Sequence, residues 1–239
     1  MAAVSENNWL GRGMQLQTAL NVSTEKISGN IMLNNPNYNF VAISDFGSAE
    51  ALHYLLVRDS IHGSMDDEVI LDGNHLVVKD QHTRVISGGE PGNIPRDPNH
   101  VDVVIDATGR FLKRDELAAH LDGGAKRVFI SRNANDQIDR YVIPGINESS
   151  IDGSDQIVST TSSTTQVLAL MVKMLDECFG LERAMMTTVH AYTADQPLAD
   201  AAGVDLRRSR SAVENIIPNT TGAPAVSYTH LRAHETPEH

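Results

Sequence analysis

The chain is poor in cysteine and in positive charge, and it has no long apolar run. Its single cysteine, Cys178, excludes an internal disulfide and a metal site built from several thiolates. No stretch is apolar enough for a membrane span, and residues 1–8 lack the layout of a signal sequence. With 19 Lys and Arg against 31 Asp and Glu, the formal charge is -12. We therefore expect a cytoplasmic protein with a small-molecule partner, and neither nucleic acid nor a membrane as a partner.

Strand and helix patterns alternate through the first 150 residues. Apolar spacing predicts a strand over residues 40–45, a helix over 49–58 and a hairpin over 69–87. A further strand over 101–107 ends in a Thr-Gly turn, and a helix and another strand follow by residue 131. Strand, glycine turn, helix and strand in about thirty residues are typical of a parallel βαβ unit. This half of the chain therefore predicts an α/β, doubly wound nucleotide-binding fold.

A hydroxyl-rich loop marks a candidate active site. Ser-Thr-Thr-Ser-Ser-Thr-Thr-Gln occupies residues 159–166, and a helical pattern follows as far as Gly180. A second segment, Met-Thr-Thr-Val-His-Ala-Tyr-Thr at 186–193, lies in a predicted strand over 185–193. A hydroxyl-rich loop at a helix N-terminus, with a lone histidine on a later strand, often joins a nucleophile to its base. Ser163 and His190 are the candidates, although such a histidine taken alone is more often structural.

The last residues differ in character from the rest. Residues 227–239 show no periodicity and contain His230, His234 and His239. Pro237 would end any helix that placed these side chains on one face, so we predict no metal site. We interpret residues 227–239 as a non-native tail.

Several motifs in the same order resemble phosphorylating glyceraldehyde-3-phosphate dehydrogenase. They are the two segments above, Asn-Ile-Ile-Pro at 215–218 and Thr-Thr-Gly-Ala at 220–223. The likeness runs from about residue 34 to about residue 226. It implies a Rossmann-like parallel-sheet domain over 1–159, followed by the start of an α+β catalytic domain over 160–226 with an incomplete antiparallel sheet. It also implies oxidation of an aldehyde to an acyl phosphate in glycolysis, with a homotetramer as the full-length form.

The resemblance assigns roles to individual residues. It implies that Ser163 stands at the nucleophile position and that His190 is the base. Sugar phosphate and inorganic phosphate would be held by hydroxyls and backbone of Ser162, Thr164, Thr193, Thr221 and Gly222. The cofactor would be bound by Asp45, Thr108, Gly109 and Ser131. An acid at the end of a strand favours NAD over NADP, although NADP is not excluded.

The chain departs from the family pattern at three places. The family's nucleophile is a thiolate, and Ser163 is barely ionised at neutral pH, so we expect phosphorylating activity to fall by many orders of magnitude. Cys178 lies about 20 Å along the same helix and does not replace it. Residues 9–13 and 21–30 only faintly echo the glycine-rich cofactor loop, and residues 1–8 predict no first strand. The family also continues beyond Ala223 with further strands of the catalytic sheet.

Two other functions stay open. One is a catalytically silent paralogue that keeps a nucleotide or phosphate site for regulation. The weaker one is a serine esterase using Ser163 and His190, for which no third group that would orient the histidine is identifiable. Three arginines in a polar loop fit either a solvated patch or an intersubunit loop beside the cofactor: Arg207, Arg208 and Arg210.

Overall fold

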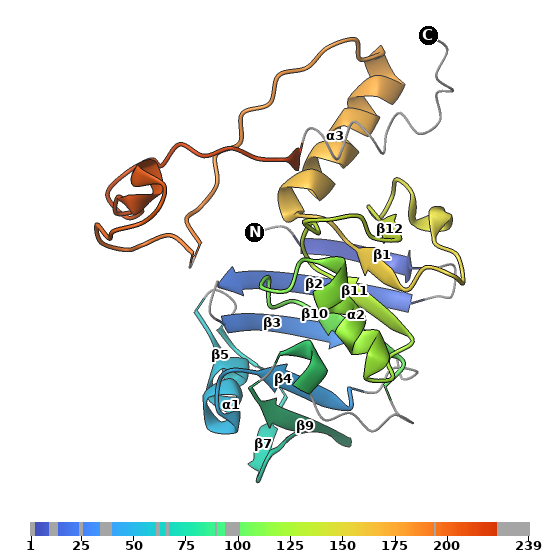
Figure 1. Cartoon of the computed structure of the whole chain (residues 1–239), viewed down its shortest axis with the longest axis vertical. Coiled ribbons are helices and arrows are strands. Elements are labelled where there is room, and N and C mark those ends of the chain that lie inside the picture. The colour runs from blue at the N-terminus through green and yellow to red at the C-terminus, as the bar shows by residue number, and fades with distance from the viewer. Residues whose placement is uncertain are drawn as a thin grey trace.

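The computed structural model describes residues 3–9, 14–23, 26–33, 40–60, 63–65, 67–88, 90–93, 101–193 and 195–223. The fold is α/β with a Rossmann-like parallel sheet, as predicted, and further sheets lie beside it (Figure 1). The tail over residues 227–239, with His230, His234 and His239, lies outside the described residues, and so do residues 10–13 of the faint glycine motif.

The first sheet is antiparallel and has the strand order β1-β2-β3. Its strands are β1 (Ala3–Trp9), β2 (Met14–Ser23) and β3 (Lys26–Leu33). The prediction that residues 1–8 form no strand is therefore wrong. Strand formation there follows from the backbone ladder to β2, which pairs Ala3 with Ala19, and a local reading of the sequence does not detect such a partner.

The second sheet confirms the predicted hairpin and extends it. It has the order β4-β9-β8-β7, with β4 parallel to β9 and the other pairs antiparallel. Its strands are β4 (Ala42–Asp45), β7 (Val69–Asp72), β8 (His75–Val78) and β9 (Gln81–Ser87). Helix α1 (Ala49–Val57) packs on this sheet. The strands β5 (Arg58–Asp59) and β6 (Gly63–Ser64) form a short separate pair after α1. Both turns use left-handed backbone, at Gly73 (φ 56°) and Lys79 (φ 53°).

The third sheet is parallel and contains the predicted βαβ unit. Its order is β10-β11-β13-β12, and it consists of β10 (Val103–Asp106), β11 (Arg127–Ile130), β12 (Arg140–Tyr141) and β13 (Ile157–Ser159). Helix α2 (Arg114–Asp122) joins β10 to β11, and short 3-10 turns lie at Pro91–Asn93 and Glu148–Ser150. Leu117 of α2 packs on Val128, Ile130 and Ile157, all of which are fully buried. This core fixes the strand ends that carry the candidate site.

Helix α3 (Ser163–Phe179) follows β13 and stops where the sequence predicts. Ser162 caps its first turn, and Gly180, with φ 69°, ends it. Beyond α3 the chain runs out to a separate lobe that contains the 3-10 turn Leu206–Ser209 (Figure 1).

The strand predicted over residues 185–193 is wrong. Among the described residues from 180 to 223 there is no strand, so the expected antiparallel catalytic sheet is not formed in this part. Met185 and Val189 are 95% and 92% exposed. A strand needs a neighbour for its N–H and C=O groups, and no described segment pairs with this one.

Candidate functional site

The carboxyl ends of the parallel strands converge on one edge of the sheet. Ser131 N–H donates to the carbonyl of Asp106 at 3.2 Å, and Thr160 N–H donates to the carbonyl of Ile130 at 3.0 Å. The Ser159 hydroxyl donates to the Arg132 carbonyl at 2.7 Å. These bonds bring the loop after β10, the loop after β11 and the start of α3 together. Ligands of open α/β sheets bind at this edge.

Asp45 is the last residue of β4, and one of its carboxylate oxygens accepts a hydrogen bond from the turn that follows. Its Oδ1 accepts from the N–H of Gly47 at 2.6 Å, whereas Oδ2 has no hydrogen bond within the described part of the chain. The guanidinium carbon of Arg110 lies 4.3 Å from the ring centre of the adjacent Phe46. This contact joins the end of β4 to the loop after β10, so the second and third sheets meet beside Asp45. The predicted role of Asp45 toward a ribose stays a prediction.

Thr108 and Gly109 form a tight turn after β10. Asp106 Oδ1 accepts from the Thr108 N–H at 2.9 Å and from its hydroxyl at 2.7 Å. Gly109 has φ 66°, and a Cβ there would lie 3.0 Å from Nη1 and 3.2 Å from Cδ of Arg132. The left-handed backbone favours glycine at this position. The turn thus presents backbone, with no side chain at Gly109, to the edge of the sheet.

The N-terminus of α3 begins with a capping hydroxyl and an exposed serine. The hydroxyl of Ser162 accepts from Thr165 N–H at 3.2 Å and bonds its hydroxyl at 2.8 Å. Ser163 is the first helical residue and is exposed, while Thr164 is half-buried. The first N–H groups of a helix have no intrahelical partner and attract anions. The sequence prediction of an anion-stabilising helix end at Ser163 fits this geometry.

Thr161 is a feature of this loop that the sequence reading missed. It has φ 64°, a backbone conformation that residues other than Gly, Asn and Asp rarely adopt. Its side chain is buried, with 1% exposure. Its Oγ1 is buried and has no hydrogen-bond partner within the described part of the chain. Gln166 Nε2 donates to the neighbouring carbonyl of Thr160 at 2.6 Å and braces the turn. A Ser/Thr-rich motif does not reveal which of its residues takes left-handed backbone.

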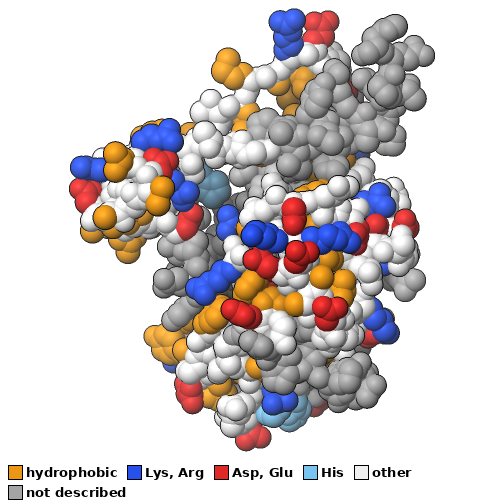
Figure 2. Space-filling model, in the orientation of Figure 1, with side chains coloured by type: hydrophobic (Ala, Val, Ile, Leu, Met, Phe, Trp, Pro, Cys, Tyr) orange, Lys and Arg blue, Asp and Glu red, His pale blue; other side chains and the backbone are white. Residues whose placement is uncertain are grey.

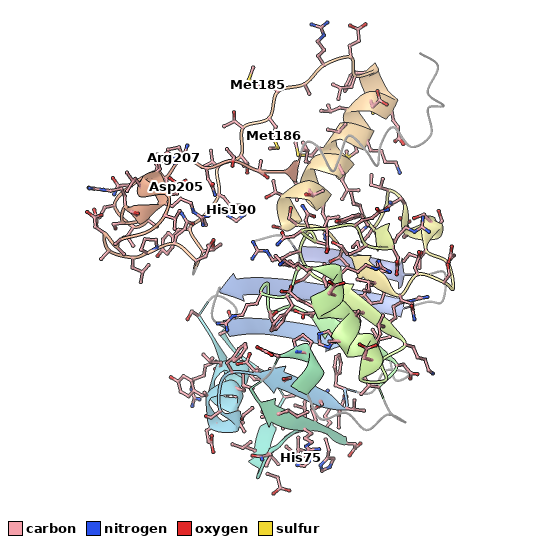
Figure 3. The ribbon with its side chains drawn as sticks, in the orientation of Figure 1. His75, Met185, Met186, His190, Asp205 and Arg207 are labelled. Carbon is pink, nitrogen blue, oxygen red and sulfur yellow. The ribbon has the colours of Figure 1, made fainter. Side chains whose placement is uncertain are left out.

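His190 lies on the segment between α3 and the lobe. Figure 3 shows it beyond Met185 and Met186 and ahead of the lobe that holds Asp205 and Arg207. Its side chain is exposed, and Nδ1 lies 2.8 Å from the carbonyl oxygen of Ala191. Across the described residues no hydrogen bond links His190 to Ser163. The pairing of base and nucleophile therefore stays a prediction.

The remaining candidate phosphate ligands lie in or beyond the lobe. Thr193 donates its hydroxyl hydrogen to Asp195, and Arg208 donates to the same carboxylate at 2.7 Å. Partial burial opposes ionisation of Asp195, but these two hydrogen bonds outweigh it and lower its pKa. Thr221 and Gly222 are exposed. Among the described residues, no hydrogen bond joins Thr193, Thr221 or Gly222 to the start of α3, so their phosphate roles also stay predictions.

The three loop arginines are each paired with an aspartate of the same lobe. The pairs are Arg207 with Asp205 at 3.0 Å, Arg208 with Asp195 at 2.7 Å and Arg210 with Asp200 at 3.4 Å. Figure 2 shows the resulting mixture of basic and acidic side chains over the lobe. In the described part of the lobe the charge of each loop arginine is thus balanced by an aspartate, and the intersubunit role stays a prediction.

Two kinds of site are not found in the described part of the chain. No group of three or more His, Cys, Asp or Glu side chains there is placed to hold a metal ion. None of the helices in these ranges has the length and apolar character needed to cross a membrane.

Comparison with known proteins matches both parts of the chain to one family. Residues 26–114 match the model of the glyceraldehyde 3-phosphate dehydrogenase NAD binding domain, and residues 162–229 match the C-terminal domain of that family. The second match ends just beyond Val226, the last residue before the proposed tail.

Individual relatives agree with the family models. Glyceraldehyde-3-phosphate dehydrogenase 1 of Bacillus subtilis (strain 168) is 44% identical over 192 residues, which are 80% of this chain and 57% of the relative. The enzyme of Geobacillus stearothermophilus is 44% identical over the same coverage. That of Zymomonas mobilis is 38% identical over 200 residues, 83% of this chain and 59% of the relative. The chain thus spans a little over half the length of these relatives.

Proposed function

The chain belongs to the glyceraldehyde-3-phosphate dehydrogenase family, and from this we propose that it binds NAD at the carboxyl edge of its sheets but has lost most phosphorylating turnover. The observation that carries the proposal is the convergence of Asp45, the turn at Thr108 and Gly109, and the exposed start of α3 at Ser163. NAD is the cofactor of the family domain that residues 26–114 match. When bound, it supplies a hydride acceptor.

Residues from three strand ends would each contact a different part of the cofactor. Asp45 Oδ2 is available to accept from a ribose hydroxyl, and its negative charge disfavours the additional phosphate of NADP. Thr108 and Gly109 offer backbone at close range, and Ser131 borders the same edge. The glycine-rich loop expected to hold the pyrophosphate falls partly outside the described residues. We therefore expect measurable but weakened binding of NAD.

The chemical step is where the chain is impaired. The Ser163 hydroxyl would add to the aldehyde carbon while its proton passes to His190. Loss of a hydride to the cofactor would leave an ester of Ser163. Phosphate would then attack the carbonyl carbon of this ester, and the Ser163 oxygen would leave and regain a proton from His190, which releases an acyl phosphate. A serine hydroxyl ionises far less readily than a thiol, and His190 is not hydrogen-bonded to it. We propose that the family's sugar phosphate and inorganic phosphate are the substrates, and that the full-length protein is a cytoplasmic homotetramer.

Calorimetric titration of the chain with NAD and NADP tests the cofactor site. We expect Asp45→Ala to weaken NAD binding about five- to tenfold, because a carboxylate partner of the ribose is lost. The ratio of the affinity for NAD to the affinity for NADP should also fall. Asp72→Ala is the matched control, since Asp72 also ends a strand of the same sheet but is exposed on β7. Equal effects of the two substitutions, or no NAD binding by the unchanged chain, would contradict the proposal.

A silent nucleotide-binding paralogue is the second candidate. It is favoured because, among the described residues, no hydrogen bond joins the exposed side chains of Ser163 and His190. Ser163→Cys in a version extended through the full catalytic domain separates the two. NADH formation from an aldehyde phosphate would support an impaired enzyme, whereas continued silence would support the paralogue. The esterase alternative requires acylation of Ser163 by an activated ester, and the lack of any acylation would remove it.

A further inference from the structure

A buried histidine and aspartate lie directly behind the proposed cofactor loop. His120, in the last turn of α2, is 3% exposed, and Asp106, at the end of β10, is 6% exposed. Nε2 of His120 lies 3.3 Å from Oδ2 of Asp106, at the long end of hydrogen-bond distances. A carboxylate removed from water is costly unless donors surround it. Neither residue was singled out by any sequence motif, because they are 14 positions apart.

The same carboxylate holds the loop through its other oxygen. Oδ1 of Asp106 accepts from both the N–H and the hydroxyl of Thr108, and the Thr108 Oγ1 in turn accepts from the N–H of Arg110 at 3.2 Å. One side chain therefore connects helix α2 to the turn that contains Gly109. The histidine engages one oxygen and the loop engages the other, so rotation of the carboxylate would break both sets of bonds.

The Arg132 side chain borders the turn, since a Cβ at Gly109 would lie 3.0 Å from its Nη1. A shift of Thr108 would move the backbone groups that face the carboxyl edge. Helix packing does not by itself explain the pair, because Leu117 anchors the same helix in the apolar core.

We propose that His120 and Asp106 are positioning residues that hold the Thr108 and Gly109 turn in the geometry that receives NAD. The inference rests on the proposed function, because it needs the turn to belong to the cofactor site. In this arrangement His120 donates from Nε2 to Asp106 and never touches the ligand itself. Its contribution reaches the cofactor only through Thr108.

The test is calorimetric titration of the whole chain with NAD, with the melting temperature measured alongside. His120→Leu removes the donor, and we expect it to raise the Kd about five- to twentyfold. His120→Gln keeps an amide donor of similar reach and should stay within about twofold of the unchanged chain. Leu117→Val, on the same helix, should lower the melting temperature without changing the Kd.

A fourth variant separates failure of this inference from failure of the cofactor site. Thr108→Val removes the hydroxyl, and the double variant with His120→Leu should weaken binding by less than the product of the two single effects. If Thr108→Val leaves the Kd unchanged, the turn is not part of the site and both proposals fail. If Thr108→Val weakens binding but His120→Leu does not, only the positioning role is overturned. Should His120→Leu not fold, His120→Asn, which is too short to reach Asp106, replaces it.

Discussion

Ser163 begins α3 with an exposed side chain, so the reactivity of any group there depends mainly on the end of the helix. The first N–H groups of α3 stabilise negative charge, whereas the carboxyl end of the same helix disfavours it. Cys178 lies near that other end and is exposed. The chain therefore offers a comparison of one chemical group at two ends of one helix.

We predict that Ser163→Cys, made together with Cys178→Ser, reacts with iodoacetamide at pH 7 about three to ten times faster than the unchanged chain, whose only thiol is Cys178. The physical reason is a lower thiol pKa at the helix N-terminus. Mass spectrometry of the alkylated protein over time measures both rates. Equal rates would show that the end of α3 does not activate a nucleophile.

At the scale of elements, one aspartate connects strand β13 to helix α2. Asp139 Oδ2 accepts from the N–H groups of Gln156 and Ile157, both at 2.9 Å, and Oδ1 lies 2.7 Å from Nη2 of Arg114. Partial burial opposes ionisation, but these hydrogen bonds and the arginine charge together lower the pKa of Asp139. A lowered pKa in the folded state means that the ionised carboxylate stabilises the fold.

Asp139→Asn should therefore cost about 1 kcal/mol of unfolding free energy at pH 7. The folded pKa lies below the unfolded value of about 3.9, so the contribution is complete above that pH and is lost as the pH falls through the folded pKa. Urea unfolding of both proteins from pH 7 to pH 3 measures the difference. A gap that stays constant down to the lowest pH would contradict the role of the charge.

At the scale of the whole molecule, the chain divides into a packed body and a segment that leaves it. Residues 101–179 contain the parallel sheet, its buried core and α3, whereas the described residues from 180 onward form the lobe and its connection (Figure 1). The exposed face of α3 includes Met174 and Phe179, which are 66% and 82% exposed. Stability is accordingly uneven along the chain.

Hydrogen exchange should report this division directly. We expect the amides of residues 185–193 to exchange at nearly the unprotected rate, because no described strand pairs with them. Amides of β11, which is paired on both sides, should be protected by opening free energies close to that of global unfolding. Mass spectrometry of proteolytic fragments separates the two. Strong protection of residues 185–193 would mean that they are paired as the sequence pattern predicts.

Much of the fold was predictable because its signals are local. Apolar spacing located α1, α2 and the β7, β8 and β9 strands, and Gly180 marked the end of α3. Asp45 and the Thr108 and Gly109 turn were also found, since strand ends followed by acids or glycine are visible in sequence. The segment at 185–193 was misread because its β-branched residues indicate strand propensity without revealing a partner.

Residue identity and short spacing were enough to predict the family and the parallel βαβ unit, whereas the role of Ser163 stays a prediction from the resemblance. Contacts between distant segments became visible only in the folded chain: His120 lies against Asp106, and Arg110 lies over Phe46. The same is true of the left-handed backbone at Thr161. It also left His190 without a bond to Ser163. Those outcomes depend on strand pairing and on contacts between distant segments, which a local pattern does not encode.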